Sequence, residues 1–265
     1  MESAKTEVIA AEPTVPASRV EPIYPPCSFE AHDPMPPEYH GLVVRLIKET
    51  GEFASSEGFN RYLRELVTRV IDMAPNIADR VTVAEFYADE NRHGFIMEGL
   101  LRELGVDPVK EFGSGFLTSI EALHLLLTDI HTWTDFALST FLLDRAAAIQ
   151  FSTYHKCSYA PMSRVGPRME HDERGHCTMG HFFLKEICAT REGRADAQQL
   201  LAKWYPTSLD MFGKSNGRRQ WEYIRFGLKS GSNEELRRRF VAEVTPLIAE
   251  LGLEVPDEHA GRKVL

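Results

Sequence analysis

The sequence predicts an all-α protein, built as a helical bundle, and three observations support this fold class. Apolar residues recur three and four positions apart in a series of long segments after residue 37. No segment alternates apolar and polar residues between hairpin turns, as a half-buried β-strand would. At 265 residues with 43% hydrophobic residues, the chain is long enough to bury one large core.

The N-terminal residues 1–37 differ from the rest because they hold eight of the fifteen prolines. Proline fixes φ and removes a backbone donor, so we expect an extended, irregular arm here. The chain is thus predicted to consist of this arm, residues 1–37, and one helical domain, residues 38–265.

The first half of the domain contains helical patterns at 41–53, 61–73 and 81–104. Ala74-Pro75 ends the second pattern and Gly105 ends the third. The pair 61–73 and 81–104 is therefore expected to form a helical hairpin.

The second half contains helical patterns at 133–151, 168–187, 197–212 and 233–253. Ala160-Pro161, Gly193 and Ser232-Asn233 separate them. Asn233 stands before Glu234 and Glu235, which predicts an N-cap followed by acidic residues in the first turn. The bundle is therefore expected to carry two or three extra helices on its C-terminal side.

Charge and cysteine content restrict the class of protein. The formal net charge of -9 argues against nucleic-acid binding, which normally requires a basic face. No run of 18 apolar residues and no secretory signal is present, so we expect no membrane span and a cytoplasmic location. Four cysteines without metal-ligand spacing agree with a reducing compartment.

Two segments, "YADENRHGF" and "HDERGHCTM", repeat a Glu-x-x-His motif as Glu90–His93 and Glu173–His176. Residues at i and i+3 lie on one face of a helix. Bundles that bind two metal ions use two such motifs and one carboxylate from each of two further helices. Carboxylates neutralise and bridge the cations, and imidazoles complete the coordination shells.

The two further carboxylates follow from hairpin geometry, because residues at equal depth are equidistant from the turn. Asp144 and Glu173 are centred on Ser158–Tyr159, beside Ala160-Pro161. Glu57 and Glu90 are centred near Met73, beside Ala74-Pro75. Glu65 is the alternative to Glu57, but its midpoint with Glu90 falls past the turn. Asp144 is also the single acid of an apolar stretch, and a buried carboxylate needs a partner.

Other residues are weaker candidates for this site. Glu121–His124 is a third match to the motif without a carboxylate at hairpin depth, so we expect it to be accidental. Glu170 is expected to be either an additional metal ligand or an acid that faces solvent. The remaining candidates are expected to pack or face solvent: His155, His171, His181 and the thiol Cys177. Lys214, Arg218 and Arg219 belong to a locally basic stretch that suits a phosphorylated handle of a substrate, or equally a solvated face.

The segments "DENRHG", "WTDFALSTFLLDRAA" and "IRFGLKSGSNEELRRRFVAEVTPLIAELGLEVPD" resemble the phenylacetate-degradation family of ferritin-like proteins, which includes the catalytic subunits of phenylacetyl-CoA epoxidases. The resemblance extends over roughly residues 40 to 257. It implies a ferritin-like four-helix bundle with additional C-terminal helices.

The same resemblance implies a di-iron monooxygenase that acts with O2 on an aromatic or acyl compound held as a coenzyme A (CoA) thioester. Electrons would come from a separate reductase, and the partner would be a related structural subunit or a second copy of the chain. The implied ligands of two iron (or manganese) ions are Glu57, Glu90, His93, Asp144, Glu173 and His176, with Glu90, Glu173 and Asp144 also catalytic. The alternatives are a ferroxidase or iron-handling protein and a non-catalytic scaffold subunit.

Overall fold

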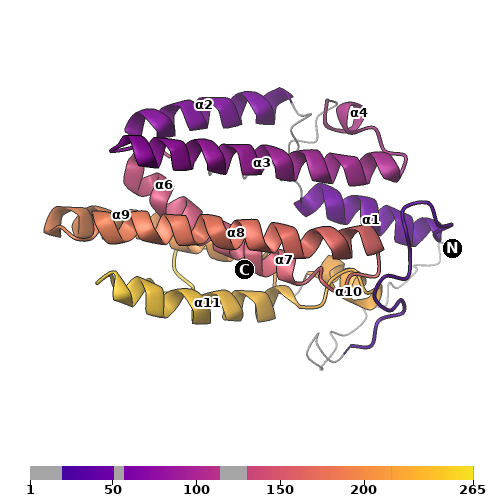
Figure 1. Ribbon diagram of the computed structural model, residues 1–265. Helices are drawn as coiled ribbons and strands as arrows, with labels where there is room; N and C mark the ends of the chain where they lie inside the picture. The colour runs from indigo at the N-terminus through magenta and orange to yellow at the C-terminus, as the bar shows by residue number, and fades with distance from the viewer. Residues whose placement is uncertain (1–19, 51–56, 114–129, 216, 265) are drawn as a thin grey trace, which may run out of the picture.

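The protein is all-helical in the part that the computed structural model describes (Figure 1). This part comprises residues 20–50, 57–113, 130–215 and 217–264, with the backbone alone for 57–63 and 111–113. Its only β pairing is an isolated parallel bridge between Phe29 and Tyr159. The predicted ferritin-like all-α fold is confirmed.

The helices follow one another in a mostly antiparallel arrangement. In chain order they are α1 (Pro37–Thr50), α2 (Glu57–Met73), α3 (Ile77–Glu103), α4 (Pro108–Gly113), α6 (Trp133–Ser139), the π-helical turn η2 (Thr140–Asp144), α7 (Arg145–Ser152), α8 (Ala160–Ile187), α9 (Arg191–Asp210), α10 (Arg218–Arg225) and α11 (Asn233–Glu250).

Two helical hairpins build the bundle, as the sequence predicts. In the first, α2 and α3 lie side by side and turn at Ala74–Asn76, where the Asn76 side chain caps α3 by accepting from the Asp79 backbone N–H at 3.0 Å. In the second, η2 and α7 pack along α8, and Pro161 stands in the first turn of α8. The helix α8 also packs against α3, which brings the two motif-bearing helices together.

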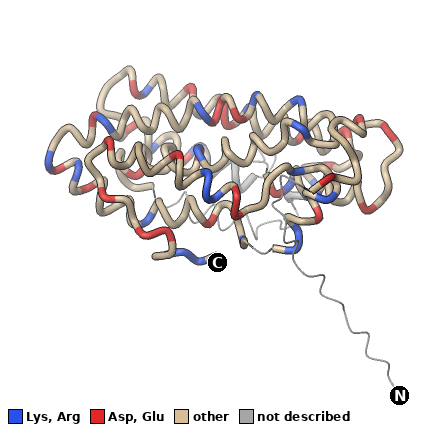
Figure 2. Tube along the Cα trace, turned by 90° about the horizontal axis from the view of Figure 1, so that it is seen from below, with Lys and Arg blue, Asp and Glu red and all other residues tan. Residues whose placement is uncertain are grey.

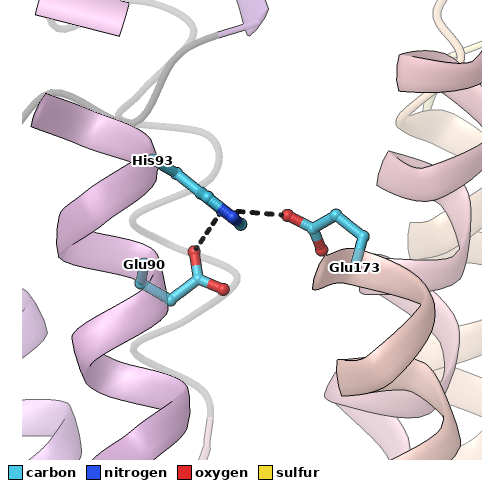
Figure 3. A group of neighbouring side chains, drawn as sticks. All are labelled: Glu90, His93 and Glu173. Carbon is cyan, nitrogen blue, oxygen red and sulfur yellow. Dashed lines mark ion pairs between the residues drawn. The ribbon is translucent and has the colours of Figure 1, made fainter. Parts of the chain in front are cut away.

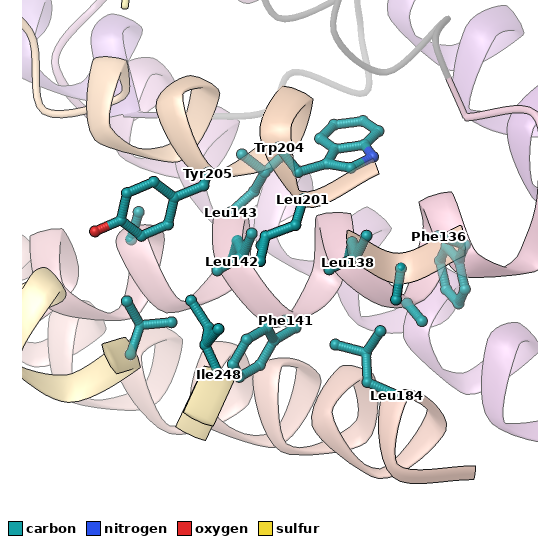
Figure 4. Close-up of a cluster of buried hydrophobic side chains, with 14 of the residues drawn as sticks. Phe136, Leu138, Phe141, Leu142, Leu143, Leu184, Leu201, Trp204, Tyr205 and Ile248 are labelled. Atoms are coloured by element: carbon teal, nitrogen blue, oxygen red, sulfur yellow. The ribbon is translucent and has the colours of Figure 1, made fainter. Parts of the chain in front are cut away.

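The hydrophobic core consists of two clusters. The first surrounds α6, η2 and α9, where Phe136, Phe141 and Trp204 are fully or almost fully buried (Figure 4). The second lies between α1, the end of α3 and the start of α8, around Tyr39 and Met97. Acidic and basic residues are interspersed along the helices seen in Figure 2, so charge is not gathered on one face in that view.

The described part of the N-terminal arm, residues 20–36, is fastened to the helical body. Cys27 donates its backbone N–H to the Cys157 carbonyl at 3.0 Å, and the Phe29 carbonyl accepts from the Ala160 N–H at 2.8 Å. Arg164 also holds both carboxylate oxygens of Glu30 at 2.8 and 2.9 Å. These residues are irregular, as expected, but they pack as part of the body. The domain division at residue 37 stays a prediction.

Two predicted boundaries in the C-terminal helices are wrong by a few residues. Gly193 does not separate helices: α9 is capped by Thr190, whose Oγ1 accepts from the Gly193 N–H at 3.0 Å. The N-cap of α11 is Ser232 rather than Asn233, because Ser232 and Glu235 form a reciprocal capping box. A serine hydroxyl followed three residues later by a glutamate satisfies two free donors, whereas Asn233 can satisfy one.

Candidate metal centre

A polar layer lies between the two apolar clusters. Along α3, Glu90 and His93 stand between Val83 of the first cluster and Met97 of the second. Along α8, Glu173 and His176 stand between Met169 of the second cluster and Phe183 of the first. These four polar side chains are at most 5% exposed. Burying several charges costs much free energy unless they are compensated, so the layer requires an explanation.

The two Glu-x-x-His motifs face each other. The Nδ1 atom of His93 is 3.4 Å from Oε1 of Glu173 on the opposite helix and 3.9 Å from Oε2 of Glu90 (Figure 3). The Nδ1 atom of His176 is 3.1 Å from Oε1 of Glu90 and 3.8 Å from Oε2 of Glu173. Each imidazole therefore contacts the glutamates of both helices, and each glutamate contacts both imidazoles.

Asp144 joins this group from the second hairpin. Single ligand atoms of Asp144, Glu173 and His176 all lie within 4.8 Å of one another, and so do those of Glu90, His93 and Glu173. Glu173 belongs to both groups. A carboxylate shared between two sets of donors is the arrangement that a bridged pair of cations needs.

Several donor atoms of the cluster lack a hydrogen-bond partner. Within the described residues, Oδ2 of Asp144 and both ring nitrogens of His176 are buried and make no hydrogen bond of good geometry. Buried polar atoms are almost always paired, so these atoms fit a ligand. Carboxylate and imidazole donors suit iron and manganese equally.

The charges of the cluster shift the titration of its members. Burial lowers the pKa of His93, but the hydrogen bond to Glu173 and the charge of Glu90 outweigh it and raise the pKa to about 9. Burial also lowers the pKa of His176, but the nearby carboxylates of Glu173 and Glu90 outweigh it and raise the pKa to about 12. Burial raises the pKa of Asp144, and repulsion by Glu173 adds to that rise. The carboxylates thus create a strong local preference for positive charge.

Two aspartates outside the cluster contact the far side of the imidazoles. Nε2 of His93 lies 3.2 Å from Oδ2 of Asp172, and Nε2 of His176 lies 3.5 Å from Oδ2 of Asp89. Asp89 also pairs with Arg92. Neither aspartate was predicted from the sequence, although each directly precedes the glutamate of a motif. The hydrogen bond to Asp172 orients the His93 ring so that Nδ1 faces the cluster, whereas Asp89 lies near His176 without a hydrogen bond.

Close packing of η2 on α8 sets the position of Asp144. A Cβ atom at Gly180 would lie 2.5 Å from the Phe141 backbone nitrogen and 2.8 Å from the Ala137 carbonyl oxygen. Only glycine allows α8 to approach this backbone so closely. The π-helical turn, which adds a residue to the helix, ends at Asp144. Such turns are frequent at functional sites.

The remaining candidates lie elsewhere. Glu57 is the first residue of α2, and its side chain lies outside the described residues; so does the pair Glu121–His124. Glu65 is exposed. Glu170 does not join the cluster, because it pairs with His155 Nε2 at 2.7 Å. The other three residues behave as expected: His171 is exposed, His181 stacks on Phe141 and Cys177 is buried.

The basic residues Lys214, Arg218 and Arg219 do not contact the cluster. All three line a cavity of about 1170 Å³ between α1, the end of α9 and α10. Arg45 and Lys229 line the same cavity. Lys229 is the last base of the basic stretch that begins at Lys214, whereas Arg45 was not predicted from the sequence to belong to a site.

The fold and the cluster define a ferritin-like helical protein with a candidate dinuclear carboxylate–histidine centre. A family model described as "Phenylacetic acid catabolic protein" matches residues 29–264, and the chain belongs to this family. It is similar to one of the subunits of the 1,2-phenylacetyl-CoA epoxidase of Escherichia coli (strain K12), with 25% identity over 239 residues that cover 87% of this chain and 74% of that protein.

None of the described helices combines the length and the apolar character that a membrane-spanning helix needs.

Proposed function

We propose that this protein is an oxygen-dependent monooxygenase with a dinuclear iron centre. The observation that carries the proposal is the convergence of Glu90, His93, Asp144, Glu173 and His176 in one polar layer, with unpaired donor atoms on Asp144 and His176. These residues would hold two iron ions together with a carboxylate from α2, for which Glu57 is the candidate. The family and the similarity to an epoxidase subunit support the oxygenase class.

When bound, the iron pair would supply the reduction and activation of O2. The overall reaction consumes one O2, two electrons and two protons, inserts one oxygen atom into the substrate and releases water. The two electrons would come from a separate flavin and iron–sulfur reductase. The relative is named as one subunit of an enzyme, which also supports a related subunit or a second copy as partner.

The residues of the chain would position and protect this chemistry. Glu90 and Glu173 supply negative charge from opposite helices, and Asp172 fixes the orientation of the His93 imidazole. Phe86 packs edge-on against His176 with ring centroids 4.7 Å apart. Such apolar walls exclude water from a reactive centre.

The substrate would be an aromatic or acyl compound carried as a CoA thioester, such as phenylacetyl-CoA. CoA holds its phosphates at one end and its acyl group at the other, joined by a long flexible arm. This shape suits a basic cavity that lies apart from the metal cluster.

The test is metal loading followed by oxygen transfer. The full-length chain is loaded anaerobically with Fe(II), reduced, exposed to ¹⁸O2 and incubated with phenylacetyl-CoA or with free phenylacetate. We expect two irons per chain and one ¹⁸O atom in the thioester product. His176→Ala should lose both, whereas the exposed His259→Ala should keep both.

Other outcomes would assign another function. Iron oxidation without a labelled product would indicate a ferroxidase, and less than about one iron per chain would indicate a scaffold subunit. Retention of two irons in His176→Ala would contradict the proposed centre itself.

A further inference from the structure

Aromatic side chains connect the candidate metal centre with the start of α6. The ring of Phe86, on α3, packs edge-on against the imidazole of His176, with centroids 4.7 Å apart. Phe86 also packs edge-on against Phe136 of α6, with centroids 5.6 Å apart. The ring of Phe136 lies 5.4 Å from that of Trp133, the first residue of α6. Each ring is therefore in contact with the next, from a candidate metal ligand to a tryptophan.

The two ends of this ring series differ in their access to water. His176 and Phe136 are 5% and 2% exposed. Trp133 is partly exposed, and Phe183 covers part of it, with ring centroids 4.7 Å apart. The series thus begins in a layer from which water is excluded and ends where solvent has access.

The chemistry of the rings gives the two ends different roles. The indole of Trp133 is the most electron-rich ring of the series and loses an electron far more readily than a phenylalanine ring does. Phe86 and Phe136 resist oxidation themselves, but their close contacts shorten the gaps that an electron must cross. Trp133 is therefore an electron donor that two phenylalanines connect to His176.

The other two of the three tryptophans in the sequence lack this connection. Trp221, in α10, is partly exposed like Trp133, but it makes no ring contact within the part of the chain that the structure describes. Trp204 is fully buried and donates its Nε1–H to Asp135 at 2.9 Å, and it too has no aromatic ring partner among the described residues. These two residues serve as internal references for Trp133.

We propose that Phe86 and Phe136 form an electron path between Trp133 and His176, and that Trp133 is the sacrificial electron donor when O2 reacts without a bound substrate. The inference rests on the proposed function, because the oxidising equivalents come from O2. An oxidant that finds no substrate in a closed site attacks the residues around it. Electron transfer from a surface tryptophan protects the buried carboxylates and imidazoles from this damage.

The electrons and atoms of this side reaction balance. Two electrons from the reduced irons and two protons convert one oxygen atom of O2 to water. The other oxygen atom, which would otherwise enter the substrate, needs two more electrons and two more protons to become water. Trp133 supplies them, one electron at a time, when it combines with one water molecule to give hydroxytryptophan. The oxygen atom of the hydroxytryptophan therefore comes from solvent and not from O2.

A single turnover without substrate tests the path. The full-length chain is loaded anaerobically with Fe(II), transferred to H2¹⁸O and given one equivalent of O2 per pair of irons. Mass spectrometry of the digested protein then measures oxidation at every tryptophan, and also at Tyr87 and Cys177, which flank Phe86 and His176. We expect ¹⁸O-labelled hydroxytryptophan at Trp133, in several-fold excess over Trp221.

Replacement of the middle ring distinguishes a path from simple exposure of Trp133. Phe136→Leu keeps an apolar side chain but removes the ring, so Trp133 should lose most of its label while O2 is still consumed. Trp221→Phe is the control and should leave the label at Trp133 unchanged. Should Phe136→Leu not fold, as judged by circular dichroism, Phe86→Leu at a partly buried position replaces it with the same expectation.

Several results would overturn the inference. These are equal labelling of Trp133 and Trp221, oxidation of Trp204, Tyr87 or Cys177 in place of Trp133, and an unchanged label at Trp133 in the folded ring variant. Oxygen that comes from O2 would indicate released peroxide and would overturn it too. Consumption of O2 without oxidised Trp133 would refute the path but leave the proposed function standing. No consumption of O2 at all would refute the proposed function, and the path with it.

Discussion

His93 and Asp172 are joined across two helices, with Nε2 of the imidazole 3.2 Å from Oδ2 of the carboxylate. The mirror relationship exists between His176 and Asp89 at 3.5 Å. Each aspartate directly precedes the glutamate of its own motif and lies beside the histidine of the motif on the opposite helix. The two segments are therefore paired units of Asp-Glu-x-x-His, in which a hydrogen bond from Asp172 orients His93 and Asp89 lies near His176 without one.

The first prediction concerns Asp172. Replacement by Asn keeps the size of the side chain but removes the charge that holds Nε2–H of His93. We expect Asp172→Asn to lower the affinity for Fe(II) or Mn(II) by about 10- to 100-fold, as loss of such supporting contacts typically does. Metal titration of the folded variant measures this, and Asp196→Asn on the exposed face of α9 is the matched control. Unchanged affinity in Asp172→Asn would show that the contact does not position the ring.

The helices and the cluster were predictable from sequence for related physical reasons. The period of apolar residues determines which face is buried, and Ala160-Pro161 stops the helix where the hairpin must turn. Asp144 and Glu173 therefore meet at equal depth, as expected. Asp89 and Asp172 escaped prediction because residues adjacent in sequence point about 100° apart on a helix. Their role becomes visible only once α3 and α8 lie together.

The second prediction concerns the carboxylate of α2, which the sequence left open between two residues. The exposed position of Glu65 keeps it away from the buried layer. We expect Glu57→Ala to reduce the metal content after anaerobic loading to one ion or fewer per chain, because a lost ligand leaves charge and geometry uncompensated. Glu65→Ala should keep two ions. Two ions in Glu57→Ala and one or fewer in Glu65→Ala would identify Glu65 as the ligand. The predicted pairing of equal depths between α2 and α3 would then be wrong.

The third prediction concerns Gly180, where α8 touches the backbone before Asp144. A methyl group there would push η2 away, and overpacking of this kind costs about 1–3 kcal/mol of unfolding free energy. We expect Gly180→Ala to be destabilised by this amount in urea and to bind metal more weakly, since Asp144 moves with η2. Gly175→Ala in the same helix meets nothing within 4 Å and should be neutral or slightly stabilised.

Neither the π-helical turn nor the cavity could be predicted from the sequence. Nothing in the apolar pattern of 133–151 distinguishes five π-helical residues from α-helix, because the extra residue is accommodated by packing against α8. The basic stretch after Lys214 was visible in the sequence. Its cavity was not, because Arg45 and Lys48 come from α1, which only the folded chain brings beside this stretch.

The last prediction uses the titration of Lys229 to test its burial. Desolvation lowers its pKa to about 8 from the ordinary 10.5, against the opposing charge of Glu49. Below about pH 8 the folded and unfolded chains both hold this proton, so the whole cost of the buried charge is present. Above that pH the folded chain releases the proton first, and the cost disappears as the pH approaches the unfolded value. Lys229→Met should therefore be more stable than the parent by about 1–3 kcal/mol near pH 7, and the difference should shrink near pH 9.5.

Urea unfolding in a buffer without phosphate measures this difference at the two pH values. The exposed Lys110→Met should show the same small difference at both. A pH-independent difference for Lys229→Met would mean that water in the cavity hydrates the ammonium fully, so that it needs no anion. Addition of CoA provides the complementary measurement, because an anion beside Lys229 raises its pKa and stabilises the parent more than the variant. The gap between parent and variant near pH 7 should then close or reverse, in proportion to the logarithm of the CoA concentration.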